Sequence, residues 1–195
     1  MKKLKIFAFI SIDGYCSRIN GDIDWVPSTN GSPLGQYGLP TFLESIDTIV
    51  MNRMQSVLIQ NNLAAWPISD KICYVLSYKG QSTMQQPPIK SICHMRPLII
   101  DDSRGILERI RALQLMGGRG HIWAMGDHRL TAYLLQYDMI DEINIVRLPV
   151  LLGSGLTFFG DFGIETQWNI EDYNKYDNGV LHIKYGKVYS ETEIA

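Results

Sequence analysis

Short apolar runs alternate with segments of helical spacing along most of this chain, and that alternation restricts the fold more than any other feature. The runs are continuous rather than alternately polar, which is typical of strands buried on both faces, as in parallel sheets. They cover residues 6–10, 48–51, 72–76, 98–100, 121–125 and 142–146.

Two segments between these runs have clear helical patterns. Residues 103–116 end at Gly117-Gly118, a common helix stop. In residues 129–137, apolar and aromatic side chains recur at i, i+3, i+4 and i+7. Each predicted helix is long enough to cross over between two parallel strands.

The pattern changes to alternation after about Gly160. Residues 168–170 and 180–185 flank a turn-rich stretch at 176–179, which predicts an antiparallel hairpin. The pieces together predict an α/β fold with a mostly parallel central sheet, helices on both faces and an antiparallel C-terminal hairpin.

The length and composition favour one globular domain over residues 1–195. A chain of 195 residues can bury a substantial core without disulfides or metals, and no linker divides it. The net charge of −2 and the 19% charged residues argue against nucleic acid as a partner. The turn-rich loop over 22–40 is of a length that is usually functional or disordered.

The cysteines and histidines give no sign of a metal or disulfide site. Cys16, Cys73 and Cys93 are odd in number and lack a C-x-x-C spacing, and the four histidines lack metal-ligand spacing. The apolar run at 6–10 is too short for a signal segment or a membrane span. We therefore expect a cytoplasmic protein with no metal and no membrane contact.

Polar residues follow the first predicted strand. Ser11 and Asp13 lie just past its carboxyl end, and Asp24 and Trp25 follow a short distance later. In open α/β sheets, ligands bind outside the carboxyl ends of the strands, so these side chains are candidates to face a substrate. Asp13-Gly14 is also a common turn pair, and local chemistry alone favours the turn.

A second constellation is the run 121–125, which passes through Gly126 into the helix that begins near Arg129. Glycine at this position would let a diphosphate approach the backbone, and the helix start offers free N–H groups. The evidence is weak by itself, because neither G-x-G-x-x-G nor G-x-x-x-x-G-K-[ST] occurs in the chain.

The order of these motifs resembles the dihydrofolate-reductase-like superfamily. S-x-D-G at 11–14, G-D-I-D-W at 21–25, I-W-x-x-G at 122–126, I-D-E at 140–142 and P-V-L-L-G-S-G at 149–155 carry the resemblance. It is strongest to the branch containing the C-terminal reductase domain of the bacterial bifunctional riboflavin-biosynthesis deaminase/reductase, and it extends from about Lys5 to Lys187.

The resemblance implies a sheet of about eight strands with NADPH across the strand carboxyl ends. The implied reaction is hydride transfer to a pterin, a pyrimidine or a ribosylamino-pyrimidine, as in reductases of dihydrofolate or 5-amino-6-(5-phosphoribosylamino)uracil. Asp13 or Asp24 would supply a proton or anchor the substrate, and the sequence does not choose between them. Trp25 and Ser11 would contact the substrate. The implied cofactor-binding residues are Ala8, Asn52, Arg53, Ser77, Met125, Gly126, Asp127 and Leu130.

Two departures from the usual pattern bear on cofactor binding. Superfamily members usually have G-R-x-T after the second strand, whereas this chain has Asn52-Arg53-Met54-Gln55, which lacks the capping hydroxyl. Asp127 stands where a second glycine is usual, and its charge would cost a nearby diphosphate on the order of 1 kcal/mol at an effective dielectric of about 20. Alternatively, Asp127 caps the following helix.

These departures keep a second hypothesis open, in which the chain binds a nucleotide or a heterocycle without catalysing a reaction. A third alternative is a purely structural dimeric subunit. Tyrosines in the last predicted hairpin favour core packing or contact between two copies, which gives a homodimer weak support. The choice between NADPH and NADH is open, with Arg53, Ser77 and Lys79 as candidate contacts for the 2′-phosphate.

Overall fold

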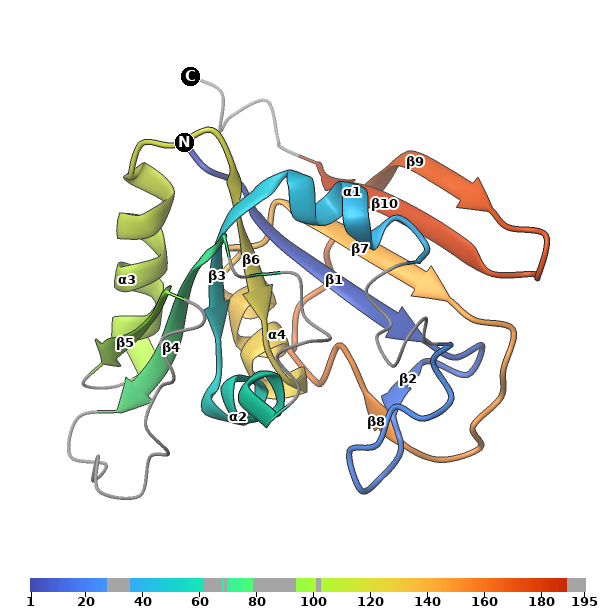
Figure 1. The fold of residues 1–195 in the computed structure, drawn as a ribbon. Coiled ribbons are helices and arrows are strands. Elements are labelled where there is room, and N and C mark those ends of the chain that lie inside the picture. Colours follow the sequence, from blue (N-terminus) through green and yellow to red (C-terminus); the bar gives the residue numbers. More distant parts are fainter. Residues whose placement is uncertain (28–35, 62–67, 69, 79–93, 101–102, 189–195) are drawn as a thin grey trace.

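The computed structural model describes residues 1–27, 36–61, 68, 70–78, 94–100 and 103–188 (Figure 1). Its main feature is an eight-stranded sheet in the order β5-β4-β3-β6-β1-β7-β10-β9. The strands are β1 (Leu4–Ile10), β3 (Ile46–Met51), β4 (Ile72–Tyr78), β5 (His94–Ile100), β6 (His121–Met125), β7 (Glu142–Arg147), β9 (Trp168–Lys175) and β10 (Leu181–Lys187).

The first six strands of the sheet, from β5 to β7, are parallel. The hairpin of β9 and β10 then adds to β7 in the antiparallel direction. The predicted fold class is therefore confirmed, including the eight strands that the family resemblance implied. The run at 6–10 is buried along nearly its whole length, because β1 lies in the interior of the sheet.

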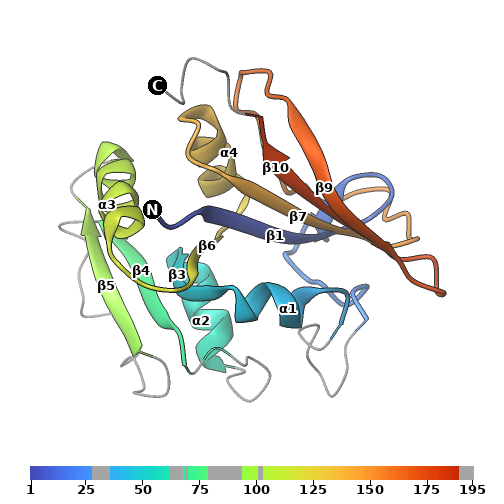
Figure 2. The same ribbon diagram turned by 90° about the horizontal axis from the view of Figure 1, so that it is seen from above.

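Helices cover both faces of the sheet (Figure 2). On one face lie α3 (Ser103–Leu115) and α4 (His128–Gln136), the two helices that the sequence predicts. On the other lie α1 (Leu39–Glu44) and α2 (Arg53–Asn61). Each face has its own apolar cluster, and β1 contributes to both because its side chains alternate: Ile6 packs toward α3 and α4, whereas Phe7 packs toward α1.

A second, two-stranded sheet was not predicted. It pairs β2 (Tyr15–Ser17) with β8 (Leu156–Thr157) and so joins the chain after β1 to the chain after β7. Gly155 permits this contact, since a Cβ at that position would lie 2.3 Å from the carbonyl oxygen of Ser17. The motif at 11–14 and the motif at 149–155 are thereby held close to each other.

Some predicted boundaries are wrong. β5 begins at His94, whereas the apolar pattern predicts a start at Leu98. The polar residues and Pro97 weaken the strand pattern in the first half of β5, but an edge strand tolerates them. Leu39 and Pro40, predicted as loop, begin α1, with proline at a position where a helix needs no N–H donor. Ser77 lies within β4 rather than after it. Residues 28–35 of the predicted loop, together with Cys93 and Lys79, lie outside the described residues.

Candidate functional site

The carboxyl ends of β3 and β6 lie side by side at one edge of the sheet. Met51 and Met125 are register partners on these two parallel strands. The turns that follow them, at Asn52-Arg53 and at Gly126-Asp127, therefore leave the sheet at the same level and lead into α2 and α4. This is the edge where an open α/β sheet binds its ligands.

Asn52 caps α2, although the family threonine is missing. Its side-chain oxygen accepts a hydrogen bond of 3.1 Å from the backbone N–H of Gln55, and its carbonyl accepts one of 3.2 Å from Ser56. The missing threonine hydroxyl therefore does not leave α2 uncapped, because Asn52, three positions before Gln55, supplies the cap. Arg53 follows directly and is half-buried.

Asp127 caps α4, as one of the two alternatives for this residue predicts. One carboxylate oxygen accepts hydrogen bonds from the backbone N–H groups of Arg129 at 3.2 Å and Leu130 at 3.1 Å. Gly126 is needed for the close approach of strand and helix, since a Cβ there would lie 2.6 Å from the Cδ2 atom of Leu130 and 2.8 Å from its Cβ atom.

The two helix starts differ in how well they suit a dinucleotide phosphate. At α2, the Arg53 cation follows a neutral Asn52 cap, which fits an anionic group. At α4, two backbone N–H groups already bind the Asp127 carboxylate, so this end does not fit a second anion in the arrangement described. The residues therefore fit a cofactor phosphate at α2 and oppose one at α4.

Asp13 connects two loops. Its carboxylate accepts hydrogen bonds from the Ser11 hydroxyl at 2.6 Å and from the backbone N–H groups of Leu152 at 3.2 Å and Gly153 at 2.7 Å. The Ser11 hydrogen bond is the main cause that lowers the pKa of Asp13, and the two amides add to it. Ser11 itself is fully buried within the turn, where its hydroxyl also accepts from the Tyr15 N–H.

Asp24 forms a two-point ion pair with Arg18, at 2.6 and 3.1 Å. Both side chains are exposed, and the hydrogen bond from Arg18 lowers the pKa of Asp24. Carboxyls with a lowered pKa are ionised at neutral pH, which suits an acceptor better than a proton donor. The structure does not bring Asp13 and Asp24 into contact, and their catalytic roles stay predictions.

The remaining predicted residues are mostly buried. Trp25 packs against the apolar cluster beneath α1, and its indole N–H is buried without a hydrogen-bond partner among the described residues. Ala8, Met125 and Leu130 are buried, so a bound cofactor would reach them through backbone atoms or at their edges. The side chain of Ser77 lies outside the described residues.

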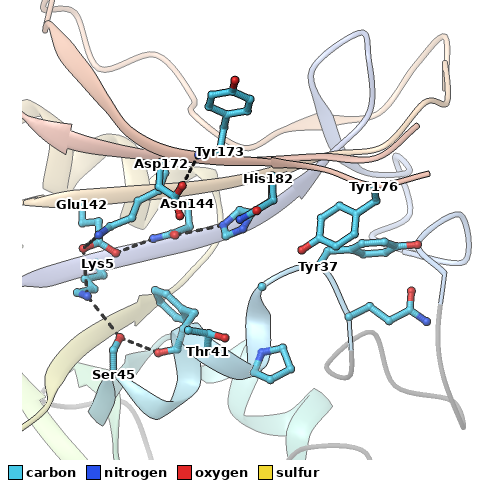
Figure 3. Close-up of a pocket in the computed structure, with 16 residues that line it drawn as sticks. Lys5, Tyr37, Thr41, Ser45, Glu142, Asn144, Asp172, Tyr173, Tyr176 and His182 are labelled. Carbon is cyan, nitrogen blue, oxygen red and sulfur yellow. Dashed lines mark hydrogen bonds and ion pairs between the residues drawn. The ribbon is translucent and has the colours of Figure 1, made fainter. Parts of the chain in front are cut away.

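A separate groove of about 530 Å³ lies between α1 and the face of β7, β9 and β10 (Figure 3). It shares no residue with the predicted site. Five elements supply many of its polar groups, including those of Lys5 from β1, Glu142 and Asn144 from β7, Asp172 from β9, His182 and Lys184 from β10, and Thr41 from α1.

The floor of this groove is a buried hydrogen-bonded network. Glu142 lies 3.0 Å from the Nζ of Lys5 and 3.6 Å from that of Lys184, and it accepts a hydrogen bond of 2.9 Å from Asn144. Asn144 in turn lies 3.3 Å from His182. Burial acts to raise the pKa of Glu142, but the Asn144 hydrogen bond and the two lysines outweigh it and hold the pKa below its usual value.

Sequence reasoning missed this network. Lys5 and Glu142 are far apart in the chain and come together only because β1 and β7 are neighbours, with Lys5 opposite Glu142 in register. A weak signal was present, since charged or amide side chains interrupt otherwise apolar strands at Lys5, Glu142 and Asn144. Within the described part of the chain, no group of three or more potential ligands could hold a metal ion.

Among the helices that the structure describes, none is both long and apolar enough to cross a bilayer.

Comparison with known proteins adds evidence on the family. Residues 2–182 match the model of the RibD C-terminal domain. Two curated proteins of Bacillus subtilis (strain 168) are similar over most of their length: the uncharacterized protein YwjB is 27% identical over 182 residues, which cover 93% of this chain and 97% of YwjB. The uncharacterized protein YyaP is 25% identical over 180 residues, or 90% of each chain.

Solved structures show the same architecture. A protein of Shewanella sp. PV-4, provisionally assigned to riboflavin biosynthesis, superimposes with a TM-score of 0.74 at 25% identity and covers 97% of this chain and 100% of its own. RibD of Acinetobacter baumannii superimposes with a TM-score of 0.67 at 12% identity, over 96% of this chain. This chain spans only 58% of that RibD chain, so the likeness there supports the fold alone.

Proposed function

This chain belongs to the RibD C-terminal domain family, and we propose from that membership that it is an oxidoreductase that reduces a small heterocycle. The substrate class is a pterin, a pyrimidine or a ribosylamino-pyrimidine, and the reductant is NADPH. The observation that carries the proposal is the match over residues 2–182, together with the helix start at Asn52-Arg53 at the ligand-binding edge of the sheet.

In this proposal the carboxyl ends of β1, β3 and β6 would hold the cofactor, which would supply the hydride. Arg53 and the start of α2 hold a phosphate, because a cation and a helix N-terminus act there together. Asp127 lies on the opposite side of the same edge and limits affinity by its charge. Trp25, whose indole N–H has no partner among the described residues, is the candidate to donate a hydrogen bond to the substrate.

The role of the acidic residues is narrower than the resemblance alone suggests. Reduction of a C=N or C=O bond needs a proton as well as a hydride, yet Asp13 and Asp24 have lowered pKa values. We therefore assign Asp13 to holding the substrate-side loops, and either carboxylate could accept a hydrogen bond from the substrate. A bound water is then the simplest proton source.

A second candidate function is ligand binding without turnover, on a degenerate cofactor site. One observation favours it: the Asp127 carboxylate occupies the two amides of α4 that a diphosphate would use. A purely structural dimeric subunit stays a third prediction, and a large apolar cleft near Asp13 and Gly126 would count against it. A homodimer and a cytoplasmic location stay predictions.

Titration of the purified protein with NADPH and NADH, by calorimetry and by thermal shift, separates the two functions. A ligand that binds only the folded protein raises the unfolding temperature by mass action. Saturable binding of NADPH supports the reductase and leads to a screen of pterins and pyrimidines, with NADPH absorbance as readout. No binding of either nucleotide at millimolar concentration contradicts the reductase and favours the binding protein.

A further inference from the structure

We propose that the groove between α1 and β10 is a second ligand site, which takes an uncharged lactam heterocycle, a ring that carries an N–H group beside a carbonyl. The acceptor for the N–H group is the Nδ1 atom of His182. This site lies on the α1 side of β7 and β10 and contains none of the residues expected to bind NADPH. It does not rest on the proposed reductase function.

The network beneath the groove fixes which nitrogen of His182 carries the proton. Asn144 uses its amide nitrogen to donate to Glu142 at 2.9 Å, so its amide oxygen is the atom that faces the His182 Nε2 at 3.3 Å. An amide oxygen only accepts hydrogen bonds, and Nε2 must therefore be the protonated nitrogen. Lys5 lies 3.0 Å from Glu142 and keeps that carboxylate charged. The carboxylate therefore accepts the hydrogen bond from Asn144, which keeps the amide oxygen of Asn144 turned toward His182.

The other ring nitrogen is consequently an acceptor. Burial lowers the pKa of His182, whereas Asp172 and Glu142 act against that shift, so the ring is neutral at neutral pH. No donor to Nδ1 is found among the described residues. Gly38 packs against the Nδ1–Cε1 edge of this ring: a Cβ there would lie 2.4 Å from Nδ1 and 2.5 Å from Cε1, so only glycine fits beside this edge.

Charge and shape narrow the class of ligand. The charged residues that line the groove balance, with Lys5 and Lys184 against Glu142 and Asp172, which disfavours phosphates and other strongly charged ligands. The Nζ of Lys184 lies 2.9 Å from Glu171 and 3.6 Å from Glu142, and this one-third exposed ammonium has a third N–H that can donate to a carbonyl oxygen. Two tyrosine rings, Tyr37 and Tyr176, lie at the His182 end with centroids 5.0 Å apart, and they form an aromatic wall (Figure 3).

These features match a ring with a donor and an acceptor side by side. The N–H group would point to His182 and the carbonyl to Lys184, while the ring contacts the tyrosines. The volume of about 530 Å³ accommodates one or two fused rings. Three polar side chains of this network, those of Lys5, Glu142 and Asn144, are more than nine-tenths buried. The polar residues of an ordinary solvent-facing sheet are exposed instead, so this burial distinguishes the groove floor from such a surface.

The test uses uracil as the probe and 1,3-dimethyluracil as the matched ligand, because the second lacks both N–H groups. ¹⁵N NMR of the histidine rings, in the full chain without NADPH, reports the tautomer and the binding together. We expect His182 to show a protonated Nε2, and uracil to shift its Nδ1 resonance saturably. Dimethyluracil should bind about fivefold more weakly or worse, since the acceptor is then left unpaired.

Two variants complete the test. His182→Phe should abolish uracil binding, whereas His128→Gln, a histidine outside this groove, should leave it unchanged. A protonated Nδ1, equal binding of the two uracils or uracil binding that survives His182→Phe overturns the proposal. So does a dimer in solution whose contact surface covers Lys184 and His182. If His182→Phe fails to fold, the comparison of uracil with 1,3-dimethyluracil on the unmodified chain still tests the proposal. NADPH binding can be measured independently in every case.

Discussion

The backbone N–H of Gly153 donates a hydrogen bond of 2.7 Å to the carboxylate of Asp13, across 140 residues of sequence. This contact joins the turn after β1 to the loop after β7, and Ile12 reinforces it through a backbone hydrogen bond of 2.8 Å to Val150. Two segments that the sequence marks separately as motifs are therefore parts of one loop assembly.

Replacing Asp13 should loosen this assembly. We expect Asp13→Ala to lower the unfolding temperature by a few degrees and to raise amide hydrogen exchange in residues 150–155, because two N–H groups lose their acceptor. Asp13→Asn keeps one acceptor oxygen and should have a smaller effect. Asp24→Ala is the control and should change neither measurement, since its ion pair is exposed. A loss of activity in Asp13→Ala with unchanged exchange would favour a direct catalytic role instead.

Acid stability should depend on Glu142. Its pKa is lower in the folded chain than the ordinary value of 4.5, so the folded state is stabilised above that pH and loses this stabilisation as pH falls below it. Chemical unfolding measured from pH 7 to pH 3 should thus show a drop on the acid side. The drop should be smaller in Glu142→Gln, which has no proton to bind there, and a curve identical to that of the natural chain would contradict the prediction.

The ion pair between Lys5 and Glu142 should show strong energetic coupling. Either Lys5→Met or Glu142→Leu alone leaves a buried charge without this partner, which typically costs about 3 kcal/mol of unfolding free energy. The double variant removes both charges and should lose less than the sum of the two single losses. A double-mutant cycle by urea unfolding measures the difference, and additive losses would contradict the coupling.

Asp127 should have opposite effects on stability and on cofactor affinity. Asp127→Ala removes the α4 cap and should cost about 1 kcal/mol of unfolding free energy, yet it should tighten NADPH binding. Asp127→Asn separates the two effects, because asparagine still caps a helix while the charge is gone. Calorimetry with NADPH and thermal unfolding of all three proteins measure both. Equal NADPH affinity in the three would show that the carboxylate does not face the phosphates.

Gly126→Ala should be destabilising even though alanine is a small residue. The new Cβ would lie 2.6 to 3.0 Å from three atoms of Leu130, including its Cβ, which no rotation of that side chain can move away. Overpacking of this kind costs about 1 to 3 kcal/mol. Gly14→Ala is the control for backbone strain, because a Cβ at Gly14 would have no atom within 4 Å although φ there is +87°. Its cost measures strain without collision. In the Leu130→Ala background the Gly126→Ala penalty should shrink.

Much of the fold could be predicted from local pattern. The apolar runs identified the strands of the parallel sheet, and the helical spacing at 103–116 and 129–137 agrees with α3 and α4 within a residue or two. The edge strand β5 was found only in part, since a strand with one neighbour carries a weaker apolar signal. The α1 helix was missed because its six residues are held by packing of Leu39, Phe42 and Leu43 rather than by helical propensity.

The site was harder to predict, for a physical reason. The positions of Asn52, Gly126 and Asp127 follow from the order of strands and turns, and local chemistry suggested the Asp127 cap. The partners of Asp13 and of Lys5 are set by contacts between segments more than a hundred residues apart. No periodicity or composition encodes such contacts, so the loop assembly and the groove network appear only when the sheet is built.

The place of β1 between β6 and β7 also determines when the protein can form its centre during synthesis. Leu4 pairs with Ile122, and Lys5 with Glu142, so β1 has no neighbour in the sheet until β6 and β7, more than a hundred residues later, have been synthesised. Closure over such long loops is slow. Until then both edges of this apolar strand are open, and unpaired edges of this kind make a folding intermediate prone to aggregation.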